Sequence, residues 1–220
     1  MTSSRNLIVS AAFVLIAAAV GLWVYPQLPA QVPTHWDLHG QPTQWTPRFW
    51  SAALPAIVLA ALAALTEALP RLSPRRFEIR PFARSYGIIM LAVQGAILVI
   101  DLSILLGSAG YALPRLTIGM LSIGVLLMVI GNYMGKLRRN FFVGIRTPWT
   151  LTNDAVWERT HRLGGRVSVL AGLLIVAAAL AGAPKAVPVA LLAAACLVPV
   201  VYSYFAYRRL EGRHTDPKGD

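Results

Sequence analysis

Apolar residues gather into six long, almost uncharged segments, and polar residues are confined to the stretches between them. The segments are 7–25, 49–66, 85–113 (interrupted by Asp101), 116–135, 167–184 and 186–207. Each is close to the roughly 20 residues, about 30 Å of helix, that the hydrocarbon core of a bilayer requires. Because the chain is 56% hydrophobic and only 13% charged, one soluble core could not enclose all six. The pattern predicts an all-α, polytopic membrane protein with six transmembrane helices.

The basic residues are placed so unevenly that they predict the orientation of the chain. If the N terminus lies in the cytoplasm, every Lys and Arg except Arg48, Arg115 and Lys185 falls in a cytoplasmic segment. Short loops rich in Lys and Arg resist translocation, so we expect both termini to be cytoplasmic. The cytoplasmic set comprises Arg5, Arg71, Arg75, Arg76, Arg80, Arg84, Lys136, Arg138, Arg139, Arg146, Arg159, Arg162, Arg166, Arg208, Arg209, Arg213 and Lys218.

The formal net charge of +11 would also suit a nucleic-acid-binding protein. Here the cations are spread over four segments that each adjoin a membrane span, which favours topology and attraction to anionic lipid. We therefore expect the lipid bilayer as a partner and no direct contact with nucleic acid.

The chain divides into four regions without a separate soluble domain. Residues 1–70 hold the first two spans and an outer loop, and 71–115 hold a basic cytoplasmic connection and the third span. Residues 116–207 carry spans four to six together with an inner loop, 136–166. Residues 208–220 form a polar cytoplasmic tail.

The outer loop combines prolines at 26, 29, 33, 42 and 47 with Trp36, Trp45 and Trp50. The prolines predict a stiff, partly extended loop without regular helix or sheet. Indole rings favour the headgroup region, so we expect this loop to lie against the outer membrane face.

Two histidines of the outer loop, His35 and His39, flank Asp37 and could in principle ligate zinc. A zinc site normally needs three or four ligands in a fixed geometry. We favour a structural or hydrogen-bonding role for them, and expect no metal and no cofactor.

The inner loop contains a turn that Pro148 imposes at Thr147, because the residue before a proline is kept out of the helical region. Before the turn, the apolar residues 141–145 suit the membrane interface. After it, Thr152, Asn153 and Asp154 can cap a helix over 155–163, which we expect to stop at Gly164–Gly165 and lead into span five.

One cation of this loop, Arg146, stands in the turn itself. Its guanidinium could bind a lipid phosphate or the carboxylate of Asp154 or Glu158. The neighbouring His161 is more typical of a helix-end partner than of a catalyst. Gly131 and Gly135 form a GxxxG that predicts close helix contact at the inner end of span four.

The run from Gly131 to Arg166, "GNYMGKLRRNFFVGIRTPWTLTNDAVWERTHRLGGR", closely resembles the signature of the SdpI-like immunity-protein family. The outer "LPAQVPTHWDLHGQP" resembles the small domain of unknown function that often precedes that signature. Asp37 stands where the family often has Asn. The matching positions that we take as candidate binding residues are Asn140, Arg146, Thr147, Pro148, Trp149, Trp157, His161, His35 and Trp36.

This resemblance implies a multi-pass protein of the bacterial inner membrane that protects the producing cell against a secreted peptide toxin. In the founding system the immunity protein also holds a cytoplasmic transcriptional repressor at the membrane when toxin is present. For this chain the resemblance implies a toxin peptide outside and a repressor inside as partners, and it leaves the oligomeric state open.

Two polar residues inside the membrane keep a second function open. Asp101 is a candidate functional carboxylate, although it could instead hydrogen-bond at the outer interface, and Gln94 lies two turns earlier on about the same face. Together they could serve a small-solute or ion transporter or channel. A further hypothesis is that spans one to three and four to six form an inverted repeat.

An enzyme is the least supported class. The sequence has no H-E-x-x-H, no G-x-S-x-G and no pair of intramembrane carboxylates, so we expect no catalytic residues. The sequence thus predicts an immunity and signalling protein that acts by binding.

Overall fold

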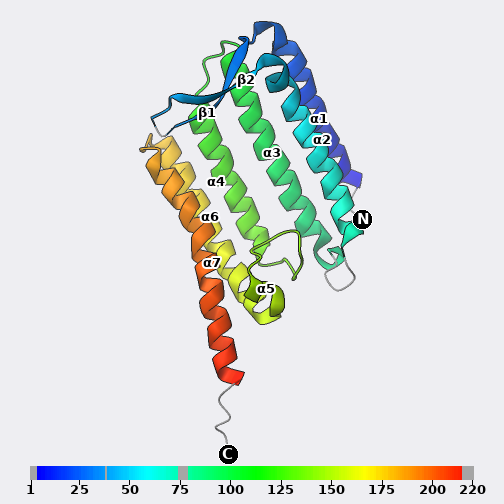
Figure 1. Cartoon of the computed structure of the whole chain (residues 1–220), viewed down its shortest axis with the longest axis vertical. Helices are drawn as coiled ribbons and strands as arrows, with labels where there is room; N and C mark the ends of the chain where they lie inside the picture. Colours follow the sequence, from blue (N-terminus) through cyan, green and yellow to red (C-terminus); the bar gives the residue numbers. More distant parts are fainter. Residues whose placement is uncertain (1–3, 38, 74–78, 215–220) are drawn as a thin grey trace, which may run out of the picture.

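The computed structural model describes residues 4–37, 39–73 and 79–214. Within these residues, six helices are long and apolar enough to cross a membrane, which confirms the predicted fold class. They are α1 (Ser4–Val24), α2 (Arg48–Leu72), α3 (Ala83–Ser108), α4 (Arg115–Met134), α6 (Asp154–Leu180) and α7 (Ala186–His214) (Figure 1).

Shorter elements lie at both ends of the bundle. A strand pair, β1 (Gln31–Trp36) and β2 (Pro42–Pro47), covers the end drawn at the top of Figure 1, and α5 (Pro148–Thr152) lies near the opposite end. Short 3-10 helices, Tyr25–Gln27 and Arg80–Phe82, follow α1 and precede α3. Three of the basic residues used to predict topology, Arg75, Arg76 and Lys218, lie outside the described residues, and the cytoplasmic orientation stays a prediction.

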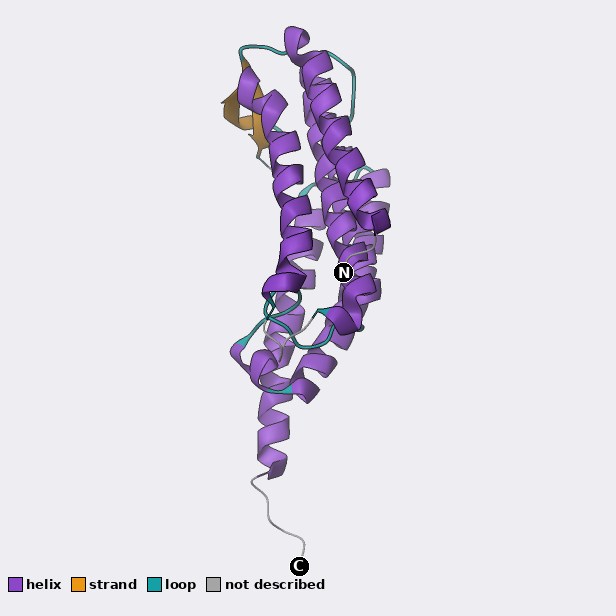
Figure 2. Cartoon of the chain, turned by 90° about the vertical axis from the view of Figure 1, so that its right-hand side faces the viewer, coloured by secondary structure: helices purple, strands orange, loops and turns teal. Residues whose placement is uncertain are grey.

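The helices form two groups that meet along α3 and α4. In the first group α1, α2 and α3 contact one another pairwise, whereas in the second α6 packs against both α4 and α7 (Figures 1 and 2). The two groups are therefore built differently, and the helix contacts lend no support to the inverted-repeat hypothesis.

Most of the apolar helix surface faces outward. Only 11% to 39% of the most apolar part of each helix is buried within the chain, and Leu22 and Leu180 are more than two-thirds exposed. Lipid is as apolar as these side chains, so the bilayer covers them and the helices associate through close packing and polar contacts instead.

Close packing is most pronounced where α4 crosses α6. A Cβ built on Gly131 would lie 2.5 Å from the carbonyl oxygen of Gly165, and a Cβ on Gly165 would lie 2.6 Å from that of Gly131. Gly124 on α4 and Gly172 on α6, each seven residues from the first pair, face each other in the same way. The expected GxxxG contact is corrected here: Gly135 makes only ordinary van der Waals contact with Arg162, and the close contact is a glycine pair repeated every seven residues.

The outer loop is more regular than its prolines predict. Strands β1 and β2 pair antiparallel over Gln31–Trp36 and Pro42–Pro47, with irregular register around His35. The expectation of a loop without sheet is therefore wrong. A two-stranded ribbon has only edge strands. Prolines are tolerated in an edge strand because its outer side has no neighbouring strand to which an N–H would donate.

The predicted helix end at Gly164–Gly165 is also wrong, because α6 runs without interruption from Asp154 to Leu180. A glycine that ends a helix normally adopts a positive φ, and among the described residues only Gly40, Gly110, Gly144 and Gly182 do so. At positions 164 and 165 glycine instead provides space, since a Cβ on Gly164 would lie 2.8 Å from Ile145 Cδ1.

Candidate functional site

The inner loop and the start of α6 form a compact structure, residues 136–161, which we call the inner platform. Its first part is organised by Asn140, whose side chain is fully buried. The amide nitrogen donates to the carbonyls of Arg138 and Val143 at 2.8 and 3.0 Å, and the amide oxygen accepts the N–H groups of Phe142 and Val143, both at 2.8 Å. One side chain thus holds the turn from residue 138 to 143.

His161 connects this turn to α6. Its Nε2 accepts the N–H of Ile145 at 2.9 Å, so Nδ1 carries the proton and donates to the Trp157 carbonyl at 2.8 Å. The imidazole stacks on the Trp157 ring at 3.9 Å between centroids. Gly144, at φ 124°, passes over this stack where a Cβ would meet both rings. His161 therefore has a structural position between helix and loop, as the sequence favoured.

The turn at Thr147 is confirmed, and it is a helix cap. Thr147 has extended backbone angles and caps α5 in a capping box with Thr150. The next cap is Asn153, whose side-chain oxygen accepts the N–H groups of Ala155 and Val156 at 2.9 and 3.2 Å and so starts α6. These two caps set the direction of the chain through the platform.

The platform is attached to α7 by a polar contact within the apolar surroundings. Thr147 Oγ1 lies 3.2 Å from the hydroxyl of Ser203, and the indole N–H of Trp149 donates to the same hydroxyl. The Trp149 ring also contacts Tyr204 and Tyr207. Ser203 was not singled out from the sequence, because a serine within an apolar span carries no signal of its partner 54 residues earlier.

The charges of the platform are paired differently from the expectation for Arg146. Asp154 pairs with Arg139 at 2.8 Å and Glu158 pairs with Arg162 at 2.5 Å. Arg146 instead donates to the carbonyl of Phe141 and is exposed. Of the two alternatives for Arg146, the bond to Asp154 or Glu158 is therefore wrong, because both carboxylates pair with other guanidinium groups, and binding of a lipid phosphate stays a prediction.

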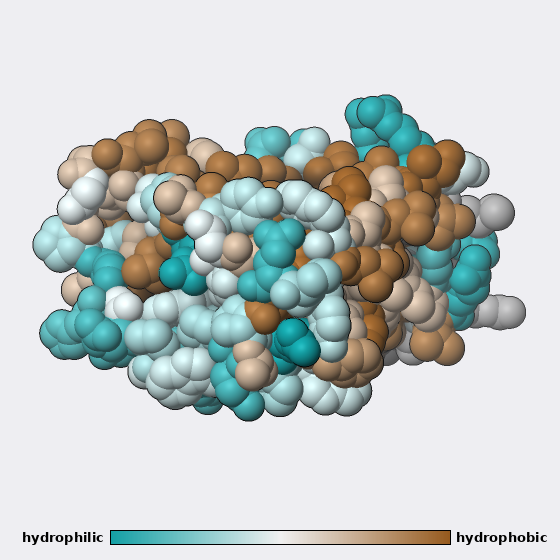
Figure 3. All heavy atoms as spheres, turned by 90° about the horizontal axis from the view of Figure 1, so that it is seen from above, coloured by the Kyte–Doolittle hydropathy of each residue, from teal (hydrophilic) through white to brown (hydrophobic). Residues whose placement is uncertain are grey.

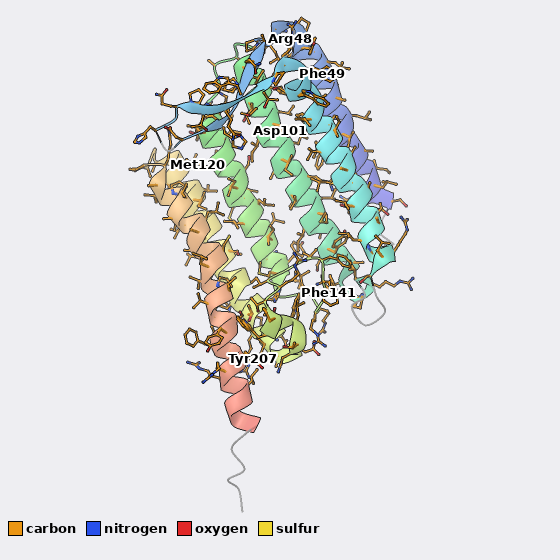
Figure 4. The ribbon with its side chains drawn as sticks, in the orientation of Figure 1. Arg48, Phe49, Asp101, Met120, Phe141 and Tyr207 are labelled. Carbon is orange, nitrogen blue, oxygen red and sulfur yellow. The ribbon has the colours of Figure 1, made fainter. Side chains whose placement is uncertain are left out.

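Part of the apolar run 141–145 is buried rather than lying in the interface. Phe142 and Val143 pack against a cluster that contains Tyr86, Leu137 and Trp157. The Trp157 N–H also donates to the Leu137 carbonyl at 2.8 Å. Phe141 itself remains 42% exposed, in the lower half of the molecule as drawn in Figure 4. Phe141 and Arg146 are thus presented side by side on the platform surface.

At the opposite end, Asp37 closes the β1–β2 turn. Its carboxylate accepts the N–H of Gln41 at 2.8 Å and that of His39 at 2.9 Å, and these bonds hold the pKa of Asp37 below its usual range. The side-chain oxygen of an Asn at this position could accept the same two bonds. Across the described residues no group of three or more His, Cys, Asp or Glu could hold a metal.

The hairpin reaches both helix groups and contacts Arg115 and Lys185, two of the cations predicted to lie on the outer side. The Arg115 guanidinium lies over the Trp36 ring at 5.6 Å, and a Cβ on Gly40 would lie 2.5 Å from Lys185 Nζ, in the turn between α6 and α7. Seen from this end, hydrophilic residues gather over part of the surface beside a hydrophobic part (Figure 3).

The two intramembrane polar residues lie in separate surroundings. Gln94 is fully buried and donates to Thr66 Oγ1 at 3.4 Å, while its side-chain oxygen has no partner within the described residues. Asp101 is half-buried in the upper half of α3 in Figure 4. No hydrogen bond joins the two within the described chain, so the contacts give no continuous polar path.

A proline explains a third polar contact that sequence reasoning missed. Pro70 lies inside α2 and lacks the N–H that would bond to the carbonyl of Thr66. The hydroxyl of Tyr86 on α3 donates to that carbonyl at 3.1 Å. The spacing of four between Thr66 and Pro70 in the sequence predicts a carbonyl without its helical partner, but the packing of α3 against α2 decides that Tyr86 is the donor.

A bundle of six membrane helices, with a hairpin on one end and a folded basic loop on the other, defines a multi-pass membrane protein with two structured loops. Residues 136–203 match the sequence model of the SdpI/YfhL protein family, and residues 12–71 match that of a domain of unknown function, DUF1648. These two matches overlap the two motifs that carry the resemblance to the SdpI-like family, and together with the six apolar helices they indicate a multi-pass protein of the bacterial cell membrane.

One relative is similar over nearly the whole chain. It is described as immunity protein SdpI of Bacillus subtilis (strain 168) and is 25% identical over 210 residues, covering 93% of this chain and 97% of that protein. No solved structure matches the chain.

Proposed function

We propose that this chain protects a bacterial cell against a membrane-damaging peptide toxin. The observation that carries the proposal is the similarity to immunity protein SdpI along 93% of the chain, which includes both structured loops. The proposed mechanism has the outer hairpin bind the toxin, and the inner platform report the bound state to a cytoplasmic repressor.

The outer hairpin is suited to a peptide that inserts into membranes. Trp45 in β2 is 55% exposed, and Phe49 and Trp50, just beyond it, are 57% and 49% exposed. Aromatic rings at this depth give large contact area to an amphipathic partner. A peptide bound here would touch the protein before it reached the hydrocarbon core.

A route from the hairpin to the platform follows α6 and α7. The Gly40 tip lies against Lys185 in the turn between these helices, and at their other end Ser203 and His161 hold the platform. A toxin that displaced the tip would shift this turn, and the movement would pass along the two helices to the surface that carries Arg146 and Phe141. The repressor would read that surface.

The first experiment tests protection. Toxin-sensitive bacteria expressing the chain should survive the peptide, and a Trp45→Ala variant should lose most of that survival. Phe205→Ala is the matched control, because Phe205 is equally exposed, at 55%, on the membrane helix α7. Unchanged killing of cells with confirmed membrane insertion of the protein would refute the proposal.

The second experiment separates reporting from protection. With a reporter gene under the repressor, Arg146→Gln should abolish the response to toxin and leave survival intact. Arg166→Gln, which removes an exposed charge on α6 outside the platform, should leave both intact. A normal reporter response in the Arg146→Gln strain would refute the assigned role of the platform surface.

A further inference from the structure

The starts of α1 and α3 enclose a cavity of about 650 Å³ at the end of the bundle that carries most of the basic residues. Arg5 and Asn6 of α1 and Arg84 of α3 line it, and none of its lining residues is acidic. Because α1, α2 and α3 alternate in direction, α1 and α3 run parallel and begin at the same membrane face. Arg5 and Arg84, each the second residue of its helix, therefore lie near the same membrane face.

The polarity of the cavity changes with depth in the same way on both helices. On α1, Val9 follows Arg5 by four residues, and on α3, Ile88 and Leu91 follow Arg84 by four and seven. At 1.5 Å per residue the apolar side chains lie roughly 6 to 10 Å deeper than the arginines. The cavity is cationic at the membrane surface and apolar toward the hydrocarbon core.

The cationic end of the cavity carries hydrogen-bond donors suited to an anionic ligand. The side-chain amide of Asn6 lies against the backbone of Gly87, where a Cβ would collide with it. Within the same described set, Arg84 forms no ion pair and is exposed. A guanidinium and an amide N–H are donors that phosphate oxygens accept.

We propose that this cavity binds an anionic phospholipid. The head-group phosphate lies between Arg5 and Arg84 with the Asn6 amide as a further donor, and the start of an acyl chain lies along Val9, Ile88 and Leu91. A soluble anion would use the donors but would leave the apolar wall uncovered, whereas a phospholipid matches both ends.

Lipid retention measures the site directly. The full chain is purified from membranes containing phosphatidylglycerol and phosphatidylcholine, and bound lipid is counted by native mass spectrometry. The wild-type protein should retain phosphatidylglycerol, and Arg84→Gln should bind it about tenfold more weakly, since one charge-assisted contact is lost. Ile88→Ser, which shortens the apolar wall and leaves every charge in place, should also lower retention.

Arg166→Gln is the matched control, because it removes an exposed arginine outside the cavity and at the same end of the bundle. Equal retention by wild type and Arg84→Gln would overturn the proposal, and so would an equal loss in Arg166→Gln, which would indicate general attraction to the surface. Inorganic phosphate that displaces the lipid as well as added phosphatidylglycerol does would overturn the assignment to a lipid. Thermal melting by circular dichroism verifies that each variant is folded.

Discussion

The glycine crossing between α4 and α6 gives the sharpest prediction for stability. A Gly131→Ala substitution adds one methyl group, whose carbon would lie 2.5 Å from the Gly165 carbonyl oxygen, 2.8 Å from Val169 Cγ2 and 2.9 Å from the Val169 nitrogen. Ordinary contacts of a Cβ begin at 3.4 Å, and two of these three atoms belong to the backbone. The helices must therefore move apart by roughly 1 Å.

The cost of that movement follows from what holds the two helices together. Association in a membrane depends on van der Waals packing, and separating two closely packed helices weakens their contacts along the crossing. Inserting a methyl group into a well-packed contact costs about 1 to 3 kcal/mol. A cost of 2 kcal/mol would change the unfolding equilibrium about thirtyfold.

Unfolding in mixed micelles titrated with SDS, followed by far-ultraviolet circular dichroism, measures this free energy. Gly119→Ala is the control, because Gly119 lies on the same helix and nothing is within 4 Å of its Cβ position. Alanine is the better helix former, so this control should be neutral or slightly stabilising.

A double variant tests whether the two glycines share one contact. Once Gly131→Ala has separated the helices, Gly165→Ala should cost less than it does alone, so the two free energies should not add. If Gly131→Ala is as stable as Gly119→Ala, the close crossing of α4 and α6 is refuted.

Three further predictions concern polar groups. Tyr86→Phe should lower the free energy of unfolding by about 1 kcal/mol, because it removes the bond to the Thr66 carbonyl. The loss should be smaller in a Pro70→Ala background, where a backbone N–H supplies that bond. Equal losses in the two backgrounds, measured by SDS titration, would contradict this explanation. Asn140→Ala should destabilise the chain by about 2 kcal/mol or more, since it leaves buried backbone groups unpaired. Limited proteolysis should then cut the inner loop faster than in the wild type, and cleavage at the wild-type rate would contradict this prediction. The pKa of Asp37 lies below the ordinary 3.8, so its ionised carboxylate stabilises the folded hairpin, and the hairpin should loosen as the pH falls through that pKa. Tryptophan fluorescence should report the loosening. An identical titration in Asp37→Asn would assign the change to another group.

The agreement between sequence and structure is closest for the spans and caps. Six apolar segments of this length form helices in lipid, because a helix makes all its backbone hydrogen bonds within its own segment, whereas an open sheet or a loop would leave N–H and C=O groups unpaired there. The turn at Thr147 and the cap at Asn153 were also predictable, since both depend on residues only two or three positions away.

Sequence reasoning failed where a residue has two possible uses. Gly164–Gly165 can end a helix or let another helix approach, and only the position of Ile145 and Gly131 decides for the second. The prolines of the outer loop prevent a central strand but allow an edge strand, so the hairpin depended on how the two segments paired.

The sequence by itself determined that this chain is a membrane protein, where its helices lie along the chain, and which family it resembles. These properties follow from local composition and short motifs, which act over one helix length or less. Only the tertiary structure decided that Ser203 holds Trp149, that Gly131 meets Gly165, and that Asp154 pairs with Arg139 rather than Arg146. Such pairs join residues distant along the chain, and their choice depends on how the packed helices are positioned.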